Sequence, residues 1–258
     1  MFLHGKFNRL SSFWRKRLTQ KVVFQNWGYC PICARKVKFV ATNQWFRDHY
    51  LCSNCGSIPR ERALMHVIQT YFPNWQNLFI HESSPINRGT SERLARECGN
   101  YIPSQFFPRE KLGAIVNGVR CENLEALTFP DESIDLHITQ DVFEHLFRPD
   151  LAFKEISRTL RPGGAHIFTT PLVNKTAPTA WLAKLESDGN IHHLITPPEY
   201  HGNPISAEGS LVTVHWGYDI TAFIHSCCGL FTEMVYIDSL DYGIRAELNE
   251  VLITRKPK

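Results

Sequence analysis

Four of the eight cysteines form two Cys-x2-Cys pairs. The pairs are Cys30/Cys33 and Cys52/Cys55, and 18 residues separate Cys33 from Cys52. A two-residue gap lets a tight turn direct both sulfurs at one ion, and two such turns complete a tetrahedron. The spacing therefore predicts a zinc ribbon. Because four thiolates leave no open coordination position, the ion is expected to be structural.

A second group of polar side chains lies between residues 171 and 215. This stretch is rich in Pro, His, Gly and Asn and is too long for an ordinary connection, so we expect an insertion that covers a cleft. A second metal site among its histidines is an alternative, although no spacing among them resembles a metal-ligand motif. The candidate substrate contacts are His192, His193, Tyr200, His201 and Asn203, with His215 nearby.

Strand and helix patterns alternate from about residue 74 onward, which predicts a mostly parallel α/β sheet of the Rossmann-like type with a closing antiparallel strand. The expected strands are Leu78–Ile80, Tyr101–Ile102, one near Ala114–Arg120, Asp135–Thr139, His166–Thr170, Phe231–Ile237 and Val251–Arg255. The expected helices are Ser91–Cys98, capped by Thr90 or Ser91, Asp150–Leu160 and Asp219–Cys227.

The N-terminal part has a different character. Apolar residues from Leu3 to Leu18 recur at helical spacing among basic residues, which suits an anionic membrane surface, bound phosphates or packing on the body of the protein. Short strands at Lys38–Thr42 and Asp48–Leu51 and a helix capped by Ser57 are expected around the second cysteine pair. The predicted units are residues 1–28, a basic amphipathic segment; 29–57, the zinc ribbon; 58–73, a linking helix; and 74–258, the larger domain with its insertion at 171–215.

Charge divides the chain in the same way. Residues 1–62 carry 12 Lys and Arg against 2 Asp and Glu, a net charge of +10, whereas the remainder carries −7. An acidic larger domain argues against a nucleic acid spread across its face. Basic residues interrupt the first 25 positions, and no apolar run is long enough to span a bilayer. We therefore expect a cytoplasmic protein, with peripheral contact at the inner membrane face through residues 1–28 left open, and expect Cys98, Cys121, Cys227 and Cys228 to be ordinary thiols.

The most specific motifs lie between Glu122 and Pro171. They are LTFPDESIDL at residues 127–136, DVFEH at 141–145 and LRPGG at 160–164. With these motifs in this order, the chain from Leu78 onward resembles a class I S-adenosylmethionine-dependent methyltransferase of the small-molecule type. The resemblance implies S-adenosylmethionine as methyl donor, bound at the ends of the parallel strands.

The resemblance also implies which residues contact the donor. The first strand ends in Glu82, Ser83 and Ser84, where the family has an acidic residue and a glycine-rich loop. The second strand offers Ser104 and Gln105 in place of an acid on the ribose. Asn123 and the Leu124 backbone are implied beside the adenine, and Gln140 at the end of the fourth strand completes the set.

Methyl transfer is a direct displacement, in which the enzyme mainly positions the reactants and a base takes the proton of a hydroxyl acceptor. The resemblance places Asp141 and His145 beside the methyl group. His145 has the more suitable pKa, although a histidine that merely packs against a helix remains an alternative.

These observations predict a methyltransferase that acts on a small or medium polar acceptor, such as a sugar unit or a lipid-linked precursor, with structural zinc. The first alternative is an RNA methyltransferase whose basic module holds RNA, with Trp14, Trp27, Trp45 and Phe46 available for stacking. The second is a zinc-ribbon scaffold protein with an idle domain, because the glycine-rich loop is missing.

Overall fold

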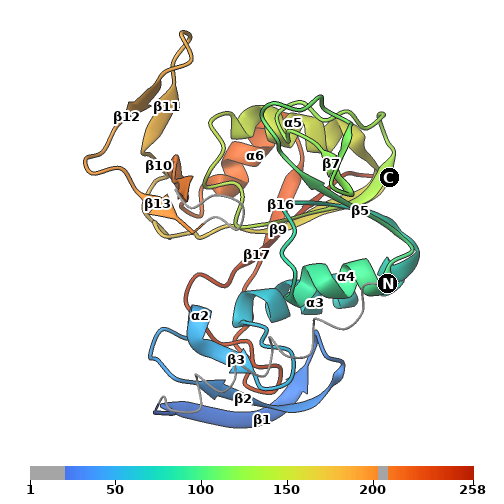
Figure 1. Cartoon of the computed structure of the whole chain (residues 1–258), viewed down its shortest axis with the longest axis vertical. Coiled ribbons are helices and arrows are strands. Elements are labelled where there is room, and N and C mark those ends of the chain that lie inside the picture. The colour runs from blue at the N-terminus through green and yellow to red at the C-terminus, as the bar shows by residue number, and fades with distance from the viewer. Residues whose placement is uncertain (1–20, 203–208) are drawn as a thin grey trace.

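The computed structural model describes residues 21–202 and 209–258 (Figure 1). The predicted segment 1–28 therefore falls largely outside the described residues, as does Asn203. Within the described ranges, no helix has the length and apolar character needed to cross a membrane.

An eight-stranded sheet forms the centre of the molecule, in the order β16-β17-β9-β8-β4-β5-β7-β6. The five strands β7, β5, β4, β8 and β9 are parallel, whereas β17 pairs with β9 and with β16 in antiparallel register. The predicted mostly parallel sheet with its closing antiparallel strand is confirmed. The strands are β4 (Phe79–Ser83), β5 (Asn100–Gln105), β6 (Ile115–Val116), β7 (Val119–Cys121), β8 (Ile134–Gln140), β9 (Leu160–Thr169), β16 (Phe231–Val235) and β17 (Val251–Arg255).

Most strands differ from their predicted extents by a few residues, and two differ in a way that the structure explains. The strand expected near Ala114–Arg120 is a hairpin of β6 and β7, because Asn117 and Gly118 adopt positive φ angles of 51° and 82° and reverse the chain. Strand β9 begins at Leu160 rather than at His166. Leu160 is fully buried and pairs with Ile134 of β8. The next pair is Leu136 with Ala165, so the register shifts between the two pairs and residues 161–164 form an irregular part of β9.

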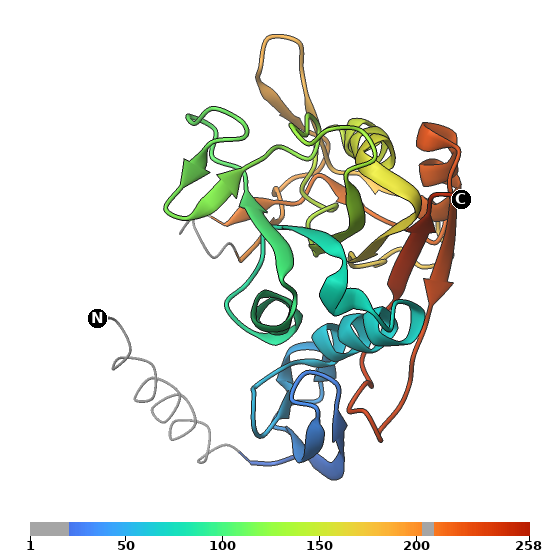
Figure 2. The same ribbon diagram turned by 90° about the vertical axis from the view of Figure 1, so that its right-hand side faces the viewer.

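Helices cover both faces of the sheet (Figures 1 and 2). On one face lie α3 (Pro59–Tyr71), the 3-10 helix η1 (Trp75–Asn77) and α4 (Gly89–Glu97); on the other lie α5 (Pro149–Thr159) and α6 (Ile220–Cys228). The predicted Ser57 cap is wrong. Helix α3 starts after Ile58, whose backbone N–H donates to the Glu61 carboxylate at 3.1 Å. Helix α4 likewise starts after Arg88 rather than at Thr90 or Ser91.

The cysteine unit is a small antiparallel sheet in the order β1-β2-β3 with one short helix. Its elements are β1 (Phe24–Cys30), β2 (Arg35–Ala41), α2 (Phe46–His49) and β3 (Tyr50–Cys52). Residues 24–28, assigned to the helical segment in the prediction, belong to β1. The strand expected at Asp48–Leu51 is divided between α2 and β3.

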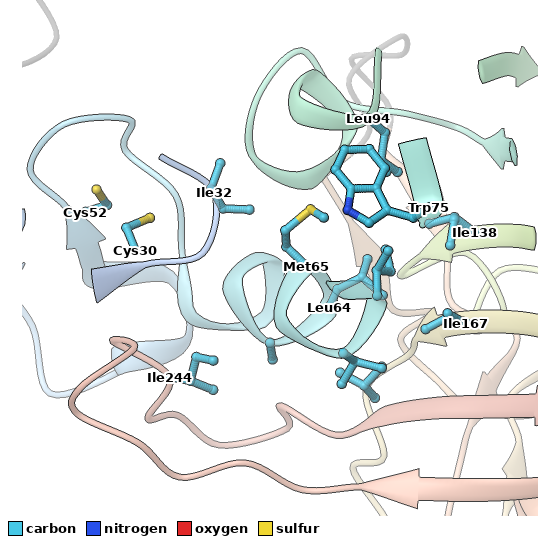
Figure 3. Close-up of a cluster of buried hydrophobic side chains, with 14 of the residues drawn as sticks. Cys30, Ile32, Cys52, Leu64, Met65, Trp75, Leu94, Ile138, Ile167 and Ile244 are labelled. Carbon is cyan, nitrogen blue, oxygen red and sulfur yellow. The ribbon is translucent and has the colours of Figure 1, made fainter. Parts of the chain in front are cut away.

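One hydrophobic core runs from the cysteine unit into the central sheet (Figure 3). Ile32 of the cysteine unit, Leu64 and Met65 of α3, and Ile138 and Ile167 of the sheet all belong to it. Leu64 and Met65 are fully buried. Helix α3 is therefore a central core element, because it packs against both regions at once.

The loop between β16 and β17, residues 236–250, also joins the two regions (Figure 1). Tyr29 donates its backbone N–H to the Asp241 carbonyl at 2.6 Å, and the Arg62 guanidinium donates to the Gly243 carbonyl. A Cβ at Gly28 would lie 2.4 Å from the Asp241 carbonyl oxygen, so this close approach requires glycine.

The described residues of the insertion at 171–215 form three two-stranded ribbons. They pair β10 (Ala180–Trp181) with β15 (Val214–His215), β11 (Ala183–Leu185) with β12 (Ile191–His193), and β13 (Tyr200–His201) with β14 (Ser210–Leu211). Val214 and the adjoining Trp216 are fully buried in a second core under α5 and α6. The β11–β12 hairpin instead projects from the body of the protein (Figure 1).

Candidate active site

A cavity of about 730 Å³ opens at the carboxyl ends of the parallel strands. Ser84 follows β4 and Asp141 follows β8, and both line the cavity. In the sheet, β5 lies on one side of β4 and β8 lies on the other. The strand order therefore reverses between the ends of β4 and β8, where Ser84 and Asp141 lie. Open α/β sheets bind their ligands at this kind of switch point.

Ser84 shapes the sheet side of the cavity. Its φ angle is +56°, a left-handed conformation that favours glycine, and its backbone N–H donates to the Ser104 carbonyl at 2.8 Å. Ser84 thus makes the tight turn that is expected of a glycine in the glycine-rich loop, which this chain lacks. Gln105 and Gln140 also line this side.

Two arginines from the N-terminal part close the opposite side. Arg47 of α2 lies 2.8 Å from the Asp141 carboxylate, and Arg60 of α3 lies 3.0 Å from the same oxygen. The other oxygen of Asp141 accepts a hydrogen bond from the Thr169 hydroxyl at 3.0 Å. Burial alone would raise the pKa of Asp141, but the two guanidiniums outweigh it and lower the pKa. Both oxygens are engaged, so Asp141 is a poor proton acceptor for a substrate.

His145 is oriented by the insertion. Its Nδ1 lies 2.8 Å from the Leu211 carbonyl oxygen, which can only accept, so Nδ1 carries the proton. In the neutral imidazole the lone pair is therefore on Nε2, which lies 3.8 Å from Oε1 of Glu144. Burial lowers the pKa of His145 and favours this neutral form.

Glu144 is almost fully buried beside His145. One carboxylate oxygen accepts from the Thr170 hydroxyl at 3.0 Å, whereas Oε1 has no hydrogen-bond partner among the described residues. Burial, and then the negative charge of Asp141, raise the pKa of Glu144 to about 8. Such a shift in a cavity is typical of functional groups.

Comparisons with known proteins indicate the class of enzyme. Residues 101–168 match the model of a family described as a methyltransferase domain. The chain contains a methyltransferase domain. The predicted enzyme class, an S-adenosylmethionine-dependent methyltransferase, is thereby confirmed.

Solved structures similar to this methyltransferase share little sequence with it. An S-adenosylmethionine-dependent methyltransferase from Mesorhizobium loti is 18% identical, with a TM-score of 0.49, and the match covers 75% of this chain and 98% of that one. For 1,6-didemethyltoxoflavin-N1-methyltransferase from Burkholderia thailandensis, with bound S-adenosylhomocysteine, the identity is 11%, the TM-score 0.43 and the coverage 77% and 79%. The comparison with curated proteins finds no match.

The predicted donor contacts fall into two groups. Ser84, Gln105 and Gln140 line the cavity of the methyltransferase, whereas Glu82 and Ser83 are buried in β4 behind it. The Glu82 carboxylate is satisfied inside the protein, because Ser91, Tyr101 and Gln140 each donate to it at 2.7 Å. Burial raises the pKa of Glu82.

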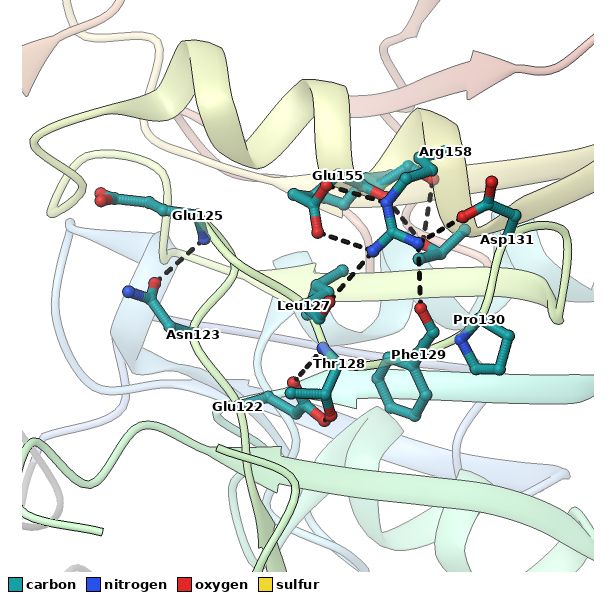
Figure 4. A network of polar contacts seen from close by, with 12 residues as sticks. Glu122, Asn123, Glu125, Leu127, Thr128, Phe129, Pro130, Asp131, Glu155 and Arg158 are labelled. Carbon is teal, nitrogen blue, oxygen red and sulfur yellow. Dashed lines mark hydrogen bonds and ion pairs between the residues drawn. The ribbon is translucent and has the colours of Figure 1, made fainter. Parts of the chain in front are cut away.

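Asn123 and Leu124 follow β7 at the same sheet edge, next to Gln105, but do not line the cavity. The Asn123 side-chain oxygen accepts from the Glu125 backbone N–H at 3.0 Å (Figure 4). Arg158 of α5 holds the segment that follows by donating to the carbonyls of Leu127 and Phe129, each at 3.0 Å. The LTFPDESIDL motif is thus a fixed support beside the cavity.

The insertion contributes only part of its predicted set. Tyr200 and His201 line the cavity. His192 and His193 lie on β12 of the projecting hairpin and are exposed, so the structure does not bring them to the site. Asn203 lies outside the described residues. Glu199 connects two histidines that do lie near the cavity, because His201 Nε2 and His215 Nε2 approach its two oxygens at 3.1 and 2.9 Å.

The four predicted zinc ligands lie together at the end of the cysteine unit. The sulfur–sulfur distances are 3.9 Å for Cys30 and Cys55 and 3.5 Å for Cys33 and Cys52. All four sulfurs lie within 4.8 Å of one another, and none forms a disulfide. Four sulfurs at about 2.3 Å from one zinc ion would lie about 3.8 Å apart, so the observed separations fit a tetrahedral site.

Sequence reasoning missed Arg47, Arg60 and Glu144. No motif marks the two arginines, although the opposite net charges of residues 1–62 and of the remainder are a signal that the two regions pair. The residues proposed for RNA stacking also have other roles. Trp45 lines the cavity, Phe46 packs against Phe24 and Tyr50, and Trp27 is exposed on β1.

Proposed function

We propose that this methyltransferase moves the methyl group of S-adenosylmethionine to an oxygen of a small or medium polar acceptor, such as a sugar unit. The observation that carries the proposal is the single cavity that Ser84, Gln105 and Gln140 line together with Asp141, His145, Tyr200 and His201. Neutral hydrogen-bonding groups lie at its sheet side, and proton-handling groups lie where the insertion covers it.

The cavity suits the methyl donor. Its volume of about 730 Å³ is within the range of small-molecule and cofactor sites. The left-handed backbone at Ser84 provides the tight turn that lets a ligand approach the end of β4 closely. The Gln105 amide and the side-chain oxygen of Gln140, whose nitrogen donates to Glu82, would bind the ribose or the amino-acid part without a charge.

The histidine side suits the acceptor. A hydroxyl oxygen near His145 would attack the methyl carbon in line, forming the new carbon–oxygen bond. The carbon–sulfur bond breaks with its electron pair on sulfur, which gives S-adenosylhomocysteine. The hydroxyl proton passes to the lone pair on Nε2 of His145, because the hydrogen bond from Nδ1 to Leu211 fixes the tautomer. We assign Asp141 a positioning role, since its carboxylate already binds two arginines.

The size of the acceptor is limited by the two regions that flank the cavity. Trp45 and Arg47 of the cysteine unit lie on one side, and Tyr200 and His201 of the insertion lie on the other. We further propose that Cys30, Cys33, Cys52 and Cys55 bind one structural zinc ion. Their sulfur separations and the core shared with α3 support this role, which is to hold Arg47 at the cavity.

The test is a calorimetric titration of S-adenosylmethionine and S-adenosylhomocysteine into the zinc-loaded protein. We expect micromolar dissociation constants for the wild type and for Ser84→Gly, and binding at least about tenfold weaker for Ser84→Val. A β-branched residue is strained at φ +56°, and its side chain would enter the cavity. Equal binding by Ser84→Val would mean that the donor lies elsewhere, and no binding up to millimolar donor would refute the proposal.

A further inference from the structure

Three potential metal ligands converge in the cavity, although they come from distant parts of the sequence. One ligand atom from each of Glu144, His145 and His201 lies within 4.8 Å of those of the other two. Glu144 and His145 follow β8, whereas His201 is on β13 of the insertion. We propose that these three side chains bind one divalent transition-metal ion at the acceptor end of the cavity.

Both histidines are held in the tautomer that a ligand needs. The Nδ1–H group of His145 is directed at the Leu211 carbonyl at 2.8 Å, which leaves Nε2 for an ion. The Nε2 atom of His201 lies 3.1 Å from the Glu199 carboxylate, which can only accept, so Nδ1 of His201 is left for an ion. Metal-binding histidines almost always have such an acceptor on their second nitrogen.

Glu144 provides an independent observation. Its side chain is 3% exposed, and Oε1 has no hydrogen-bond partner among the described residues while lying 3.8 Å from Nε2 of His145. A buried carboxylate oxygen without a partner is costly. A cation between Oε1 and the two imidazoles would satisfy it. Two ligands of one ion lie at most about 4.3 Å apart, so a small movement of the side chains would complete the set.

The donor set indicates the kind of ion. Two imidazoles and one carboxylate suit zinc, manganese, iron, cobalt or nickel better than magnesium or calcium, which prefer oxygen ligands alone. Three protein ligands leave coordination positions open, as in catalytic rather than structural sites. The four-cysteine cluster has the opposite character, because its soft thiolates close the coordination sphere.

The role that we give to the ion rests on the proposed function, although its binding does not. An acceptor with a hydroxyl and a neighbouring oxygen, such as a vicinal diol, would occupy the open positions. The ion would lower the pKa of the bound hydroxyl, so its proton would leave to solvent water instead of passing to the lone pair of His145. The acceptor is therefore expected to be a compound that chelates the ion through two neighbouring oxygens.

The experiment uses the full-length protein loaded with one equivalent of zinc for the cysteine cluster and freed of excess zinc, which would compete for the second site. Mn²⁺ is titrated into it, and the electron paramagnetic resonance signal of free Mn²⁺ falls as the ion binds. Thiolates are poor ligands for manganese, so the cysteine cluster does not interfere. We expect one Mn²⁺ per chain. We expect Glu144→Gln and His201→Ala each to weaken binding at least about tenfold, as loss of a ligand should. The double variant His192→Ala/His193→Ala, on the projecting hairpin, should bind like the wild type.

Two results would overturn the inference: no Mn²⁺ binding by the wild type up to millimolar ion, or equal binding by the wild type, Glu144→Gln and His201→Ala. His201 is partly exposed on a ribbon, so His201→Ala tests the site even where Glu144→Gln fails to fold. Parallel calorimetry with S-adenosylhomocysteine separates this inference from the proposed function. Donor binding without Mn²⁺ binding would refute the metal site and would leave the proposed function, with direct proton transfer to His145, intact.

Discussion

The two sides of the cavity are built in different ways. On one side, which we call the arginine wall, Arg47 and Arg60 have side chains 7% and 16% exposed and both bind Asp141. On the other side lies the histidine wall of Glu144, His145 and His201. The His201 side chain is 39% exposed, and one Glu144 oxygen has no hydrogen-bond partner within residues 21–202 and 209–258. The arginine wall has its charges satisfied within the protein, whereas the histidine wall keeps donor and acceptor capacity for a ligand.

This difference indicates a division of tasks. A buried, fully paired ion cluster fixes the relative position of two regions, because breaking it exposes charges that have no replacement partner. Unpaired groups in a cavity are the ones that can exchange a proton or bind an ion. The cysteine unit therefore determines the shape of the site, and the histidine wall provides its chemistry.

The largest expected effect comes from dismantling the support of the arginine wall. Cys52→Ser should release zinc and reduce the free energy of unfolding by about 4 kcal/mol or more, because a structural metal contributes directly to folding. Since the core runs from the cysteine unit through α3 into the sheet, the variant should unfold in urea as one transition at a lower midpoint.

Cys227→Ser, outside the cluster, is the matched control and should retain both zinc and stability. Two separate urea transitions in Cys52→Ser, one of them at the wild-type midpoint, would show that the sheet does not depend on the cysteine unit.

A smaller effect is expected from the ion cluster itself. Asp141→Asn leaves the buried Arg47 guanidinium without a counter-charge and leaves Arg60 with only Asp48, 3.6 Å away, so it should cost about 3 kcal/mol of unfolding free energy. His201→Ala, in the histidine wall, should cost less than about 1 kcal/mol, because its contacts are partly exposed. Urea unfolding of both variants compares the two walls directly. Equal losses would contradict the division into a fixed and a reactive side.

The smallest expected effect concerns histidines that belong to neither wall. His81, His137 and His166 are fully buried in the sheet, and burial lowers the pKa of His81 and His166 to about 3. Between about pH 3 and 6.5 the unfolded chain binds more protons at these positions, so stability falls as pH falls through this window. From pH 6.5 to pH 5 the loss is at most about 2 kcal/mol for each histidine.

The pKa values of Glu82 and Glu144 are raised, so these two groups favour the folded state as pH falls, opposite to the histidines. The effect of one histidine must therefore be measured by comparing the wild type with a variant. Between pH 7.5 and pH 5 the wild type should lose about 2 kcal/mol more than His166→Gln, measured by urea unfolding at both pH values. His225→Gln, at an exposed position on α6, should follow the wild type. Identical pH dependence of His166→Gln and the wild type would show that His166 does not resist protonation.

The features that could be predicted from the sequence are those that depend on residues close together along the chain. The Cys-x2-Cys spacing located all four sulfurs, and alternating strands and helices predicted the sheet with its closing antiparallel strand. The three motifs between Glu122 and Pro171 identified the enzyme class. The DVFEH segment also carries Asp141 and His145, which both reach the cavity.

What the sequence could not predict depends on contacts between distant segments. Asp141 is 94 residues from Arg47, and no spacing rule links them. The convergence of Glu144 and His145 with His201 requires the insertion to fold back across the end of β8. His192 and His193 show the reverse case, because their residue types suggested a substrate contact and their hairpin carries them into solvent.

The most direct test of the whole account is a crystal structure of the zinc-loaded protein with S-adenosylhomocysteine. We expect the ligand to lie between the two walls, with its amino-acid part beside Ser84 and its sulfur facing the space between His145 and His201. We also expect Arg47 and Arg60 still to bind Asp141. A ligand outside this cavity, or one whose sulfur faces away from the histidine wall, would contradict it.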